Sequence, residues 1–251
     1  MNSAIVSLEH ITLAYHTTRG DRTVLQDISL SLHEGEQLAL YAPNGSGKTS
    51  LLRCITGLLP PKAGKIFFHG QELRQEKDFQ KLRRRVGFVL QEAADQIFFP
   101  TVLEDIAFGP LNLGLTPEAA KERACVLLKT LGIANLQDRP THELSGGEKR
   151  LVALAGILAM EPEALLLDEP TTALDNEASD KLLDILTHVS TARITVSHDL
   201  LFLSKVADTF YTIEQQKLVT MPQPVLHSHL HAHIGGAIKH SHNLTGSSQK
   251  A

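Results

Sequence analysis

The segment at residues 42–49, Ala-Pro-Asn-Gly-Ser-Gly-Lys-Thr, constrains the fold of this chain more than any other. It follows an apolar run at residues 37–41 that predicts a strand, and an apolar run at residues 50–55 that predicts a helix comes next. In such a strand, turn and helix, the backbone N–H groups of the turn and of the helix N-terminus point at one anion. Lys48 is expected to reach the β and γ oxygens of a nucleotide, and the Thr49 hydroxyl to bind Mg²⁺. The segment therefore predicts a phosphate-binding P-loop.

The first position of this loop is Ala42, where the usual pattern has Gly. If that position needs a positive φ, Ala costs about 1 kcal/mol. Gly45 and Gly47 are expected to let the backbone close around the phosphates without Cβ clashes. The alternative is a Gly-rich turn with a chance Lys-Thr pair, and the strand and helix on either side disfavour it.

Length, composition and charge narrow the class of protein. The chain has 251 residues, of which 42% are hydrophobic and 21% are charged, enough for one α/β domain with an inserted subdomain or for two units. The longest apolar stretch, residues 151–160, is too short to span a bilayer, and no signal segment is evident, so a cytoplasmic location is expected. Cys54 and Cys125 have no paired spacing and are interpreted as small buried apolar residues. A net charge of −4 gives no basic field for nucleic acid, so none is expected as a partner.

The first part of the chain predicts an antiparallel β layer. Residues 4–13 and 27–32 alternate apolar with polar side chains, as half-buried strands do. Tyr15 ends the first of these strands in a chain with only three Tyr and no Trp. It is a candidate to stack on a nucleotide base; the alternative is an ordinary aromatic residue at the rim.

Polar side chains follow three predicted strands of a parallel sheet, at the edge where α/β proteins bind ligands. The strands cover residues 86–90, 164–167 and 193–196. Gln91 could bind Mg²⁺ or orient water, although most such glutamines are only solvated. Asp168 is predicted to hold Mg²⁺, and Glu169 to polarise an attacking water. His198, which would more often be structural, is predicted to sense the γ-phosphate.

A second helix N-terminus suited to an anion lies at residues 144–149, Leu-Ser-Gly-Gly-Glu-Lys, before a helical run at residues 150–160. Ser145 is the predicted N-cap, with Gly146 and Gly147 beside it. Two phosphate-directed termini in one chain suggest a γ-phosphate that is held from two sides.

Between these motifs, residues 92–160 predict a helical insertion. Thr116 as N-cap and Pro117 at the first helical position mark one helix, whose apolar spacing continues to Gly132. Residues 95–102 carry aromatic and β-branched side chains in a segment that should form a loop, and its apolar part lies at residues 97–102. We interpret them as a partner-docking surface in preference to an ordinary core segment.

Together these motifs resemble an ATP-binding cassette (ABC) ATPase, and the resemblance covers about residues 4–220. It implies an α/β P-loop NTPase with a RecA-like core, an antiparallel β subdomain and a helical subdomain at about 92–160, all within an ATP-binding domain at 1–220. It also implies that two such chains enclose two ATP with Mg²⁺, and that Glu148 and Thr172 depart from the commoner Gln and Ser. The implied nucleotide-binding residues are Tyr15, Asn44, Gly45, Ser46, Gly47, Lys48, Thr49, Ser50, Asp168 and, from the signature and D-loop, Ser145, Gly146, Gly147 and Asp175.

A narrower resemblance links residues 86–114 to the A-component of energy-coupling factor (ECF) importers, close to the ATPases of cobalt and nickel importers. It implies a homodimer at the cytoplasmic face of the bacterial inner membrane. A transmembrane T-component would dock near Gln91, and a membrane substrate-binding component would complete the importer.

The last part of the chain, residues 221–251, is predicted to be a flexible His-rich tail. Six of the thirteen histidines lie between His227 and His242. In an extended backbone, His227, His229, His231 and His233 would share one side, and imidazole clusters suit Ni²⁺, Co²⁺, Cu²⁺ or Zn²⁺. The alternative is a disordered polar terminus.

The function predicted from the sequence is therefore ATP hydrolysis that powers nickel or cobalt import. An ECF ATPase for a vitamin is an alternative. A soluble ABC protein is disfavoured because neither internal duplication nor sustained heptads occur. A metal store is disfavoured because every catalytic position is filled.

Overall fold

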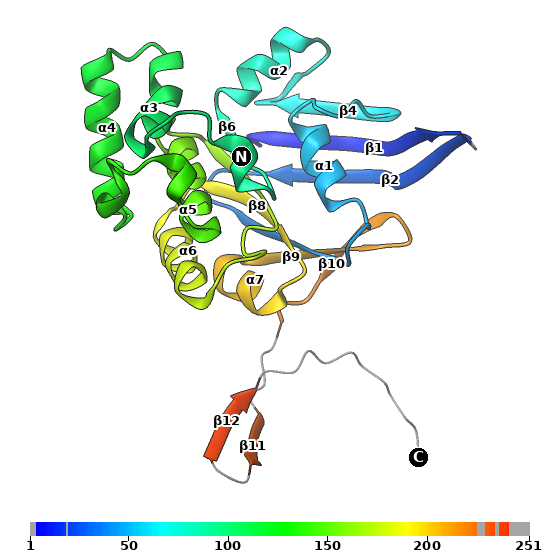
Figure 1. Cartoon of the computed structure of the whole chain (residues 1–251). Helices are drawn as coiled ribbons and strands as arrows, with labels where there is room; N and C mark the ends of the chain where they lie inside the picture. Colours follow the sequence, from blue (N-terminus) through cyan, green and yellow to red (C-terminus); the bar gives the residue numbers. More distant parts are fainter. Residues whose placement is uncertain (1–3, 19, 225–228, 234–235, 241–251) are drawn as a thin grey trace.

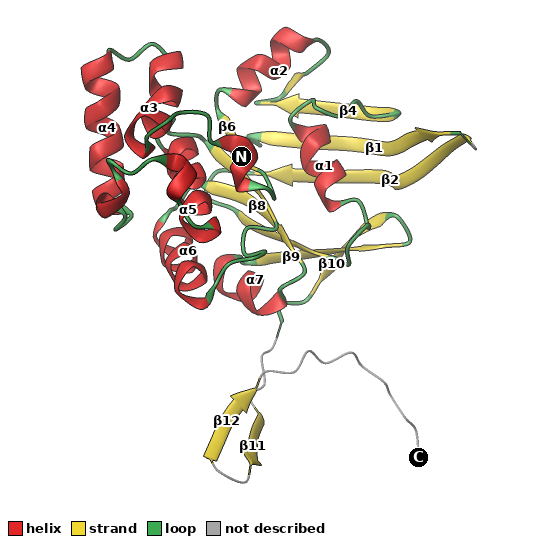
Figure 2. Cartoon of the chain, in the orientation of Figure 1, coloured by secondary structure: helices red, strands yellow, loops and turns green. Residues whose placement is uncertain are grey.

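The computed structural model describes residues 4–18, 20–224, 229–233 and 236–240. Figure 1 shows the main body with strands β1, β2 and β4 gathered at one side and helices α3, α4, α5 and α6 at the other. A central sheet runs between them, as the colouring by secondary structure in Figure 2 makes clear.

The central sheet has six strands in the order β10-β9-β3-β8-β7-β6, and all neighbouring pairs are parallel except β10 with β9. The parallel strands are short and apolar, and β7 and β8 are buried along their whole length, as expected for strands covered on both faces. The strands are β3 (Gln37–Tyr41), β6 (Val86–Val89), β7 (Ala164–Asp168), β8 (Ala192–Ser197), β9 (Thr209–Glu214) and β10 (Lys217–Met221).

The second sheet is antiparallel, as the alternating pattern near the N-terminus predicted. Its two long strands run further than predicted, because their pairing continues to the hairpin between Thr17 and Gly20. The strands, in the order β2-β1-β4-β5, are β1 (Val6–Thr17), β2 (Gly20–Leu32), β4 (Ala63–Phe68) and β5 (Gln71–Glu72).

Helices α1, α4 and α5 follow the helix signals of the sequence, whereas α2, α6 and α7 were not predicted. The predicted helix at Thr116 is confirmed as α4, and the Thr116 hydroxyl accepts a bond from Ala119 N at 3.3 Å. Helix α3 was not predicted; it starts in the apolar segment interpreted as a loop, with Thr101 and Glu104 forming a capping box. The helices are α1 (Lys48–Ile55), α2 (Glu76–Arg83), α3 (Val102–Asn112), α4 (Pro117–Thr130), α5 (Gly146–Leu158), α6 (Asn176–His188) and α7 (Leu200–Val206), with 3-10 turns η1 (Ala93–Gln96), η2 (Ala134–Leu136) and η3 (Thr141–Glu143).

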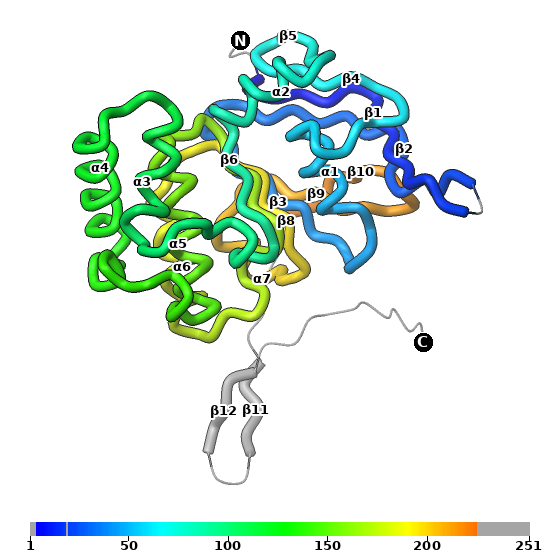
Figure 3. The backbone as a smooth tube through the Cα atoms, turned by 45° about the horizontal axis from the view of Figure 1, so that its top comes forward, coloured from blue at the N-terminus to red at the C-terminus, as the bar shows by residue number. Residues whose placement is uncertain are grey.

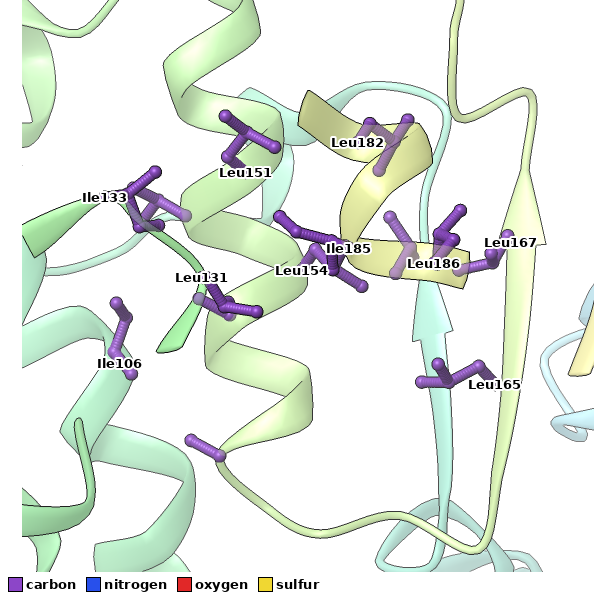
Figure 4. Close-up of a cluster of buried hydrophobic side chains, with 14 of the residues drawn as sticks. Ile106, Leu131, Ile133, Leu151, Leu154, Leu165, Leu167, Leu182, Ile185 and Leu186 are labelled. Carbon is purple, nitrogen blue, oxygen red and sulfur yellow. The ribbon is translucent and has the colours of Figure 1, made fainter. Parts of the chain in front are cut away.

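Two apolar cores flank the central sheet. On β3, Leu38 and Leu40 pack into one core with α1 and the antiparallel sheet, whereas Ala39 between them belongs to the other core. Figure 4 shows part of that other core, where Leu154 of α5 lies beside Ile185 of α6, and Leu186 of α6 lies beside Leu167 of β7. In the turned view of Figure 3, the helices of this core again lie together at one side of the sheet. The two cores hold the central sheet between them. The sheet therefore gives a rigid support to the strand ends where the predicted site residues lie.

Beyond residue 224 the structure describes β11 (His229–His233) and β12 (Gly236–His240), which pair antiparallel with His229 opposite His240. His227, the first of the predicted metal ligands, lies outside the described residues. Within the part of the chain that is described, no group of three or more His, Cys, Asp and Glu side chains is placed to hold a metal ion. The domain boundary near residue 220 and the flexible tail stay predictions.

The two cysteines differ in environment, and the expectation that both are buried is wrong for Cys125. Cys54 is fully buried in α1, and burial raises the pKa of its thiol to about 12, while Cys125 is partly exposed on α4. We expect a thiol reagent at pH 8 to modify Cys125 readily and Cys54 hardly at all, because Cys54 is fully buried and holds about 10³-fold less thiolate than a free cysteine would. Both should react in denaturant. Equal labelling of the two in the native protein, measured by peptide mass spectrometry, would contradict this placement.

Candidate active site

The predicted P-loop connects β3 to α1. Gly45 and Gly47 have φ values of 78° and 104°, and a Cβ at Gly47 would lie 2.8 Å from Val24 Cγ1, so both space and backbone angle require glycine there. Ala42 is buried and is not among the described non-glycine residues with positive φ. Ala42 therefore does not carry the strain that a positive φ at this position would have caused.

The Lys48 ammonium is buried among oxygen atoms at the first turn of α1. It forms an ion pair with Glu169 Oε1 at 3.0 Å and donates to Pro43 O at 3.2 Å and to Ala42 O. Both side chains of the ion pair are about 5% exposed. The P-loop cation and the predicted catalytic carboxylate, 121 positions apart in the sequence, thus share one site.

Thr49 and Asp168 meet beside this pair. Thr49 Oγ1 donates to Asp168 Oδ1 at 3.1 Å across the gap between α1 and the end of β7. Burial raises the pKa of Asp168, and the Thr49 bond only partly offsets this. A hydroxyl and a carboxylate in contact, with the Gln91 amide on the wall of the neighbouring pocket, form the all-oxygen donor set that Mg²⁺ prefers. These residues fit the predicted metal role.

Glu169 is fixed by the adjacent strand end. Its Oε2 accepts bonds from His198 Nδ1 at 2.8 Å, from His198 N at 3.2 Å and from Ser197 Oγ at 3.2 Å. Burial raises the pKa of Glu169, but Lys48 and His198 outweigh it, so the net pKa lies below its ordinary value. Its backbone has a φ of 47°, an uncommon conformation for a non-glycine residue and one that clusters at functional sites. The geometry thus presents an ionised carboxylate beside a histidine.

A pocket of about 500 Å³ opens over these groups. Tyr15 lies at its wall, 40% exposed, and its hydroxyl is 2.8 Å from Ser50 Oγ of α1. Arg22, which pairs with Tyr15 across the β1–β2 hairpin, was not predicted at the site. The lining residues are Tyr15, Thr17, Arg22, Val24, Asn44, Gly45, Ser46, Gly47, Lys48, Thr49, Ser50, Gln91 and Glu169.

The second predicted anion site is separate from the first. Ser145 caps α5 in a capping box with Glu148, and Asp175 caps α6 by accepting from Ala178 N at 2.8 Å. Both line a different pocket of about 510 Å³, and in the described residues the two pockets have no lining residue in common. Within one chain, Ser145 and Asp175 therefore line a different pocket from Lys48, and Gly146 and Gly147 follow Ser145 in the first turn of α5.

Arg150 on α5 joins three loops of the site, a role the sequence did not reveal. Its side chain is 5% exposed and donates to the carbonyl oxygens of Gln91 at 2.6 Å, of Glu169 at 3.1 Å and of Thr172 at 3.3 Å. The sequence did contain one signal for this role, because Arg150 is a charged residue at the start of an otherwise apolar helical run. An arginine that is buried with such a helix needs several hydrogen-bond acceptors.

Gln96 holds the loop that carries Gln91. Its amide accepts from Leu90 N at 2.7 Å and donates to Phe88 O at 2.8 Å. We expect Gln96→Ala to lower the hydrogen-exchange protection of the Leu90 amide by at least about tenfold, because that N–H loses its acceptor. Gln80→Ala on the exposed face of α2 is the matched control. Unchanged exchange of the Leu90 amide in Gln96→Ala would show that Gln96 does not hold this loop.

Comparison with known proteins identifies the class to which this site belongs. The family model of ABC transporters matches residues 25–172, and the chain belongs to the ATP-binding proteins of that family. Such proteins bind ATP and hydrolyse it to drive transport. In the described residues, no helix is long and apolar enough to cross a bilayer.

Individual relatives support the narrower resemblance. The cobalt import ATP-binding protein CbiO of Rhodobacter capsulatus is 45% identical over 208 residues, which cover 81% of this chain and 73% of the relative. The solved structure of cbiO1 from Clostridium perfringens, described as part of the ABC transporter complex cbiONQ, has a TM-score of 0.75 and 32% identity over 86% of this chain and 87% of that one. The dimeric bacterial ABC transporter cassette MJ0796 has a TM-score of 0.78 and 25% identity over 85% and 96%. The predicted ABC cassette fold is confirmed.

Proposed function

We propose that this chain is the ATP-hydrolysing subunit of an ECF-type importer for cobalt or nickel ions. The observation that carries the enzymatic part is the meeting of Lys48, Thr49, Asp168, Glu169 and His198 at one sheet edge beside a nucleotide-sized pocket. Separate elements supply these groups, and a purely structural role would not require all of them in one place.

The residues have distinct roles in this proposal. Lys48 and the N–H groups of the Gly45–Gly47 turn hold the phosphates, and the exposed Tyr15 ring offers a face to the adenine. Asn44, Ser46 and Ser50 complete the cradle. Thr49, Asp168 and Gln91 would hold Mg²⁺, which when bound neutralises phosphate charge.

Hydrolysis is assigned to Glu169 and His198. The Glu169 carboxylate accepts a proton from a water whose oxygen attacks the γ-phosphorus, while the bond from that phosphorus to its bridging oxygen breaks and ADP leaves. Glu169 holds the His198 ring through Nδ1, and a γ-phosphate oxygen would accept from Nε2–H when both ring nitrogens carry a proton.

Two copies of the chain are needed to enclose ATP. The P-loop pocket and the pocket beside Ser145 are separate within one chain, so a second copy must place its Ser145, Gly146, Gly147 and Asp175 over the first copy's phosphates. The similarity to a dimeric cassette supports a homodimer. This arrangement gives each γ-phosphate donors from two sides.

An exposed apolar surface on α3 and the segment before it suits the membrane partner. Phe98 is 73% exposed, and Phe108 and Leu111 on α3 are about 40% exposed, with the rings of Phe99 and Phe108 4.7 Å apart. We assign this surface to helices of a transmembrane T-component, which would keep the chain peripheral at the cytoplasmic face of the inner membrane beside a substrate-binding membrane component.

The substrate assignment rests on the relative named for cobalt import and on the resemblance of residues 86–114 to metal-importer ATPases. It is tested by uptake of labelled cobalt and nickel in cells that lack this chain. Restoration of uptake of one metal by the wild type, but not by Glu169→Gln, supports the proposal and names the metal. If neither metal responds while the assembled complex hydrolyses ATP, the metal assignment fails and vitamin import is tested next. If uptake of neither a metal nor a vitamin depends on this chain, a soluble ABC role is favoured instead.

We assign transition-metal binding to the histidines near the C-terminus, His227, His229, His231 and His233. The support is their alternation in the sequence and the extended backbone of β11. Calorimetric titration of the full chain with Ni²⁺ and Co²⁺, against a variant with all four changed to Ala, tests this. Equal heats for the two proteins would leave the tail without a metal role.

A further inference from the structure

The cap of α5 carries an acidic residue, Glu148, that is held by an arginine from outside the helix. Arg139 Nη1 donates to Glu148 Oε1 at 2.6 Å, and Arg139 Nη2 donates to Glu143 O at 3.0 Å. The other carboxylate oxygen of Glu148 accepts from Ser145 N at 2.8 Å. Arg139 thus contacts both Glu148 and the segment that leads into the capping residue.

The negative charge of Glu148 would repel a phosphate that binds at the N-terminus of α5. The bond from Ser145 N lowers the pKa of Glu148, with Arg139 contributing, so the carboxylate is ionised at neutral pH. The pocket beside it is lined by four acids, Glu143, Glu148, Asp175 and Glu177, and by two bases, Arg139 and Lys181. Lys181 donates instead to Gly132 O at 2.6 Å. Of these two bases, Arg139 is the one that contacts the acid within the capping box.

We propose that Arg139 is a positioning residue for the nucleotide held between two copies of this chain. It neutralises Glu148 and keeps that carboxylate turned onto Ser145 N, away from the incoming γ-phosphate. Without it, an unpaired negative charge would lie within the first turn of the helix that receives the phosphate, where repulsion is strong. The ion pair of Arg139 with Glu148 leaves no net negative charge beside the phosphate, as an uncharged side chain at position 148 would. This inference rests on the proposed function of the Ser145 terminus.

A double-mutant cycle on the purified full-length chain tests the inference, with kcat and KM for Mg-ATP as readouts. Arg139→Met is expected to raise KM about tenfold and to leave kcat within about twofold, because nucleotide capture is impaired and the Glu169 chemistry is not. Adding Glu148→Gln to Arg139→Met should return KM to within about twofold of the wild type. Lys181→Met, which removes a charge from the same pocket without touching Glu148, is the control and should not raise KM.

Several outcomes would overturn the role of Arg139: an unchanged KM in Arg139→Met, an equal loss in kcat, no rescue by Glu148→Gln, or an equal rise in KM in Lys181→Met. A merely structural role would lower the Tm of Arg139→Met and would not be rescued by removing the Glu148 charge. Ser145→Ala separates this inference from the proposed function. If Ser145→Ala leaves KM unchanged, the proposed nucleotide contact itself fails; if it raises KM while the cycle shows no coupling, only the Arg139 inference fails.

Discussion

Replacing Glu169 with Gln should lower kcat for ATP hydrolysis by about 10²–10⁴-fold, the usual contribution of a general base, while nucleotide binding persists. The amide keeps the shape of the side chain but cannot accept the proton of the attacking water. Lys48 loses its ion pair with Glu169 but keeps its bonds to Ala42 O and Pro43 O, so Lys48 and the P-loop turn can still carry the phosphate contacts of this proposal. Phosphate release measures the loss of turnover, and equilibrium titration with a fluorescent ATP analogue measures the retained binding.

Glu163 provides a matched control for this substitution. It lies just before β7, at the opposite end of the strand from Glu169, and its carboxylate also contacts a histidine, His69 Nε2 at 2.6 Å. Glu163→Gln therefore removes a similar carboxylate–histidine contact far from the site, and kcat should stay within about twofold of the wild type. A Glu169→Gln enzyme that keeps more than about a tenth of wild-type kcat would show that another group is the base.

The second large effect is expected on stability, at Arg193 in β8. Its side chain is fully buried and donates to Val206 O at 2.7 and 3.1 Å, to Val189 O at 2.9 Å and to Gln37 Oε1. Burial lowers the pKa of Arg193 to about 10, only partly offset by the charge of Asp208. Arg193→Met should lower the free energy of unfolding by about 3–5 kcal/mol, because the buried Val206 O and the partly buried Val189 O and Gln37 Oε1 all lose their donor.

Arg74→Met is the control for the stability measurement, because Arg74 forms only an exposed pair with Glu72. It should change the free energy of unfolding by less than about 1 kcal/mol. Urea unfolding followed by circular dichroism compares the two variants. A loss below about 1 kcal/mol in Arg193→Met would show that its bonds are not needed to hold β3, β8 and the ends of α6 and α7 together.

The sheet-edge residues could be predicted because their positions follow from local rules. Parallel strands end at one edge, so polar residues directly after apolar strands must gather there. The structure accordingly brings Glu169 and His198 into contact and places Gln91 on the wall of the same pocket as Glu169.

Other parts of the site depend on long-range contacts that no local pattern encodes. Arg150 and Gln96 act through backbone carbonyl and N–H groups, whose partners are known only when the loops are in place. Arg139 was missed because its partner, Glu148, comes from a different element. Helix α3 was missed because its apolar start was interpreted as a docking loop. The proposed phosphate contacts of Ser145 would require a second chain, which neither the sequence pattern nor one folded copy supplies.

The most direct test of this account is the mass of the Glu169→Gln variant in solution, measured by sedimentation with and without Mg-ATP. We expect a monomer without nucleotide and a dimer with it, because trapped ATP would join the P-loop of one copy to the Ser145 terminus of the other. Adding Ser145→Ala should weaken this dimer at the same ATP concentration. A variant that binds ATP tightly yet stays monomeric at every protein concentration would contradict the shared nucleotide site.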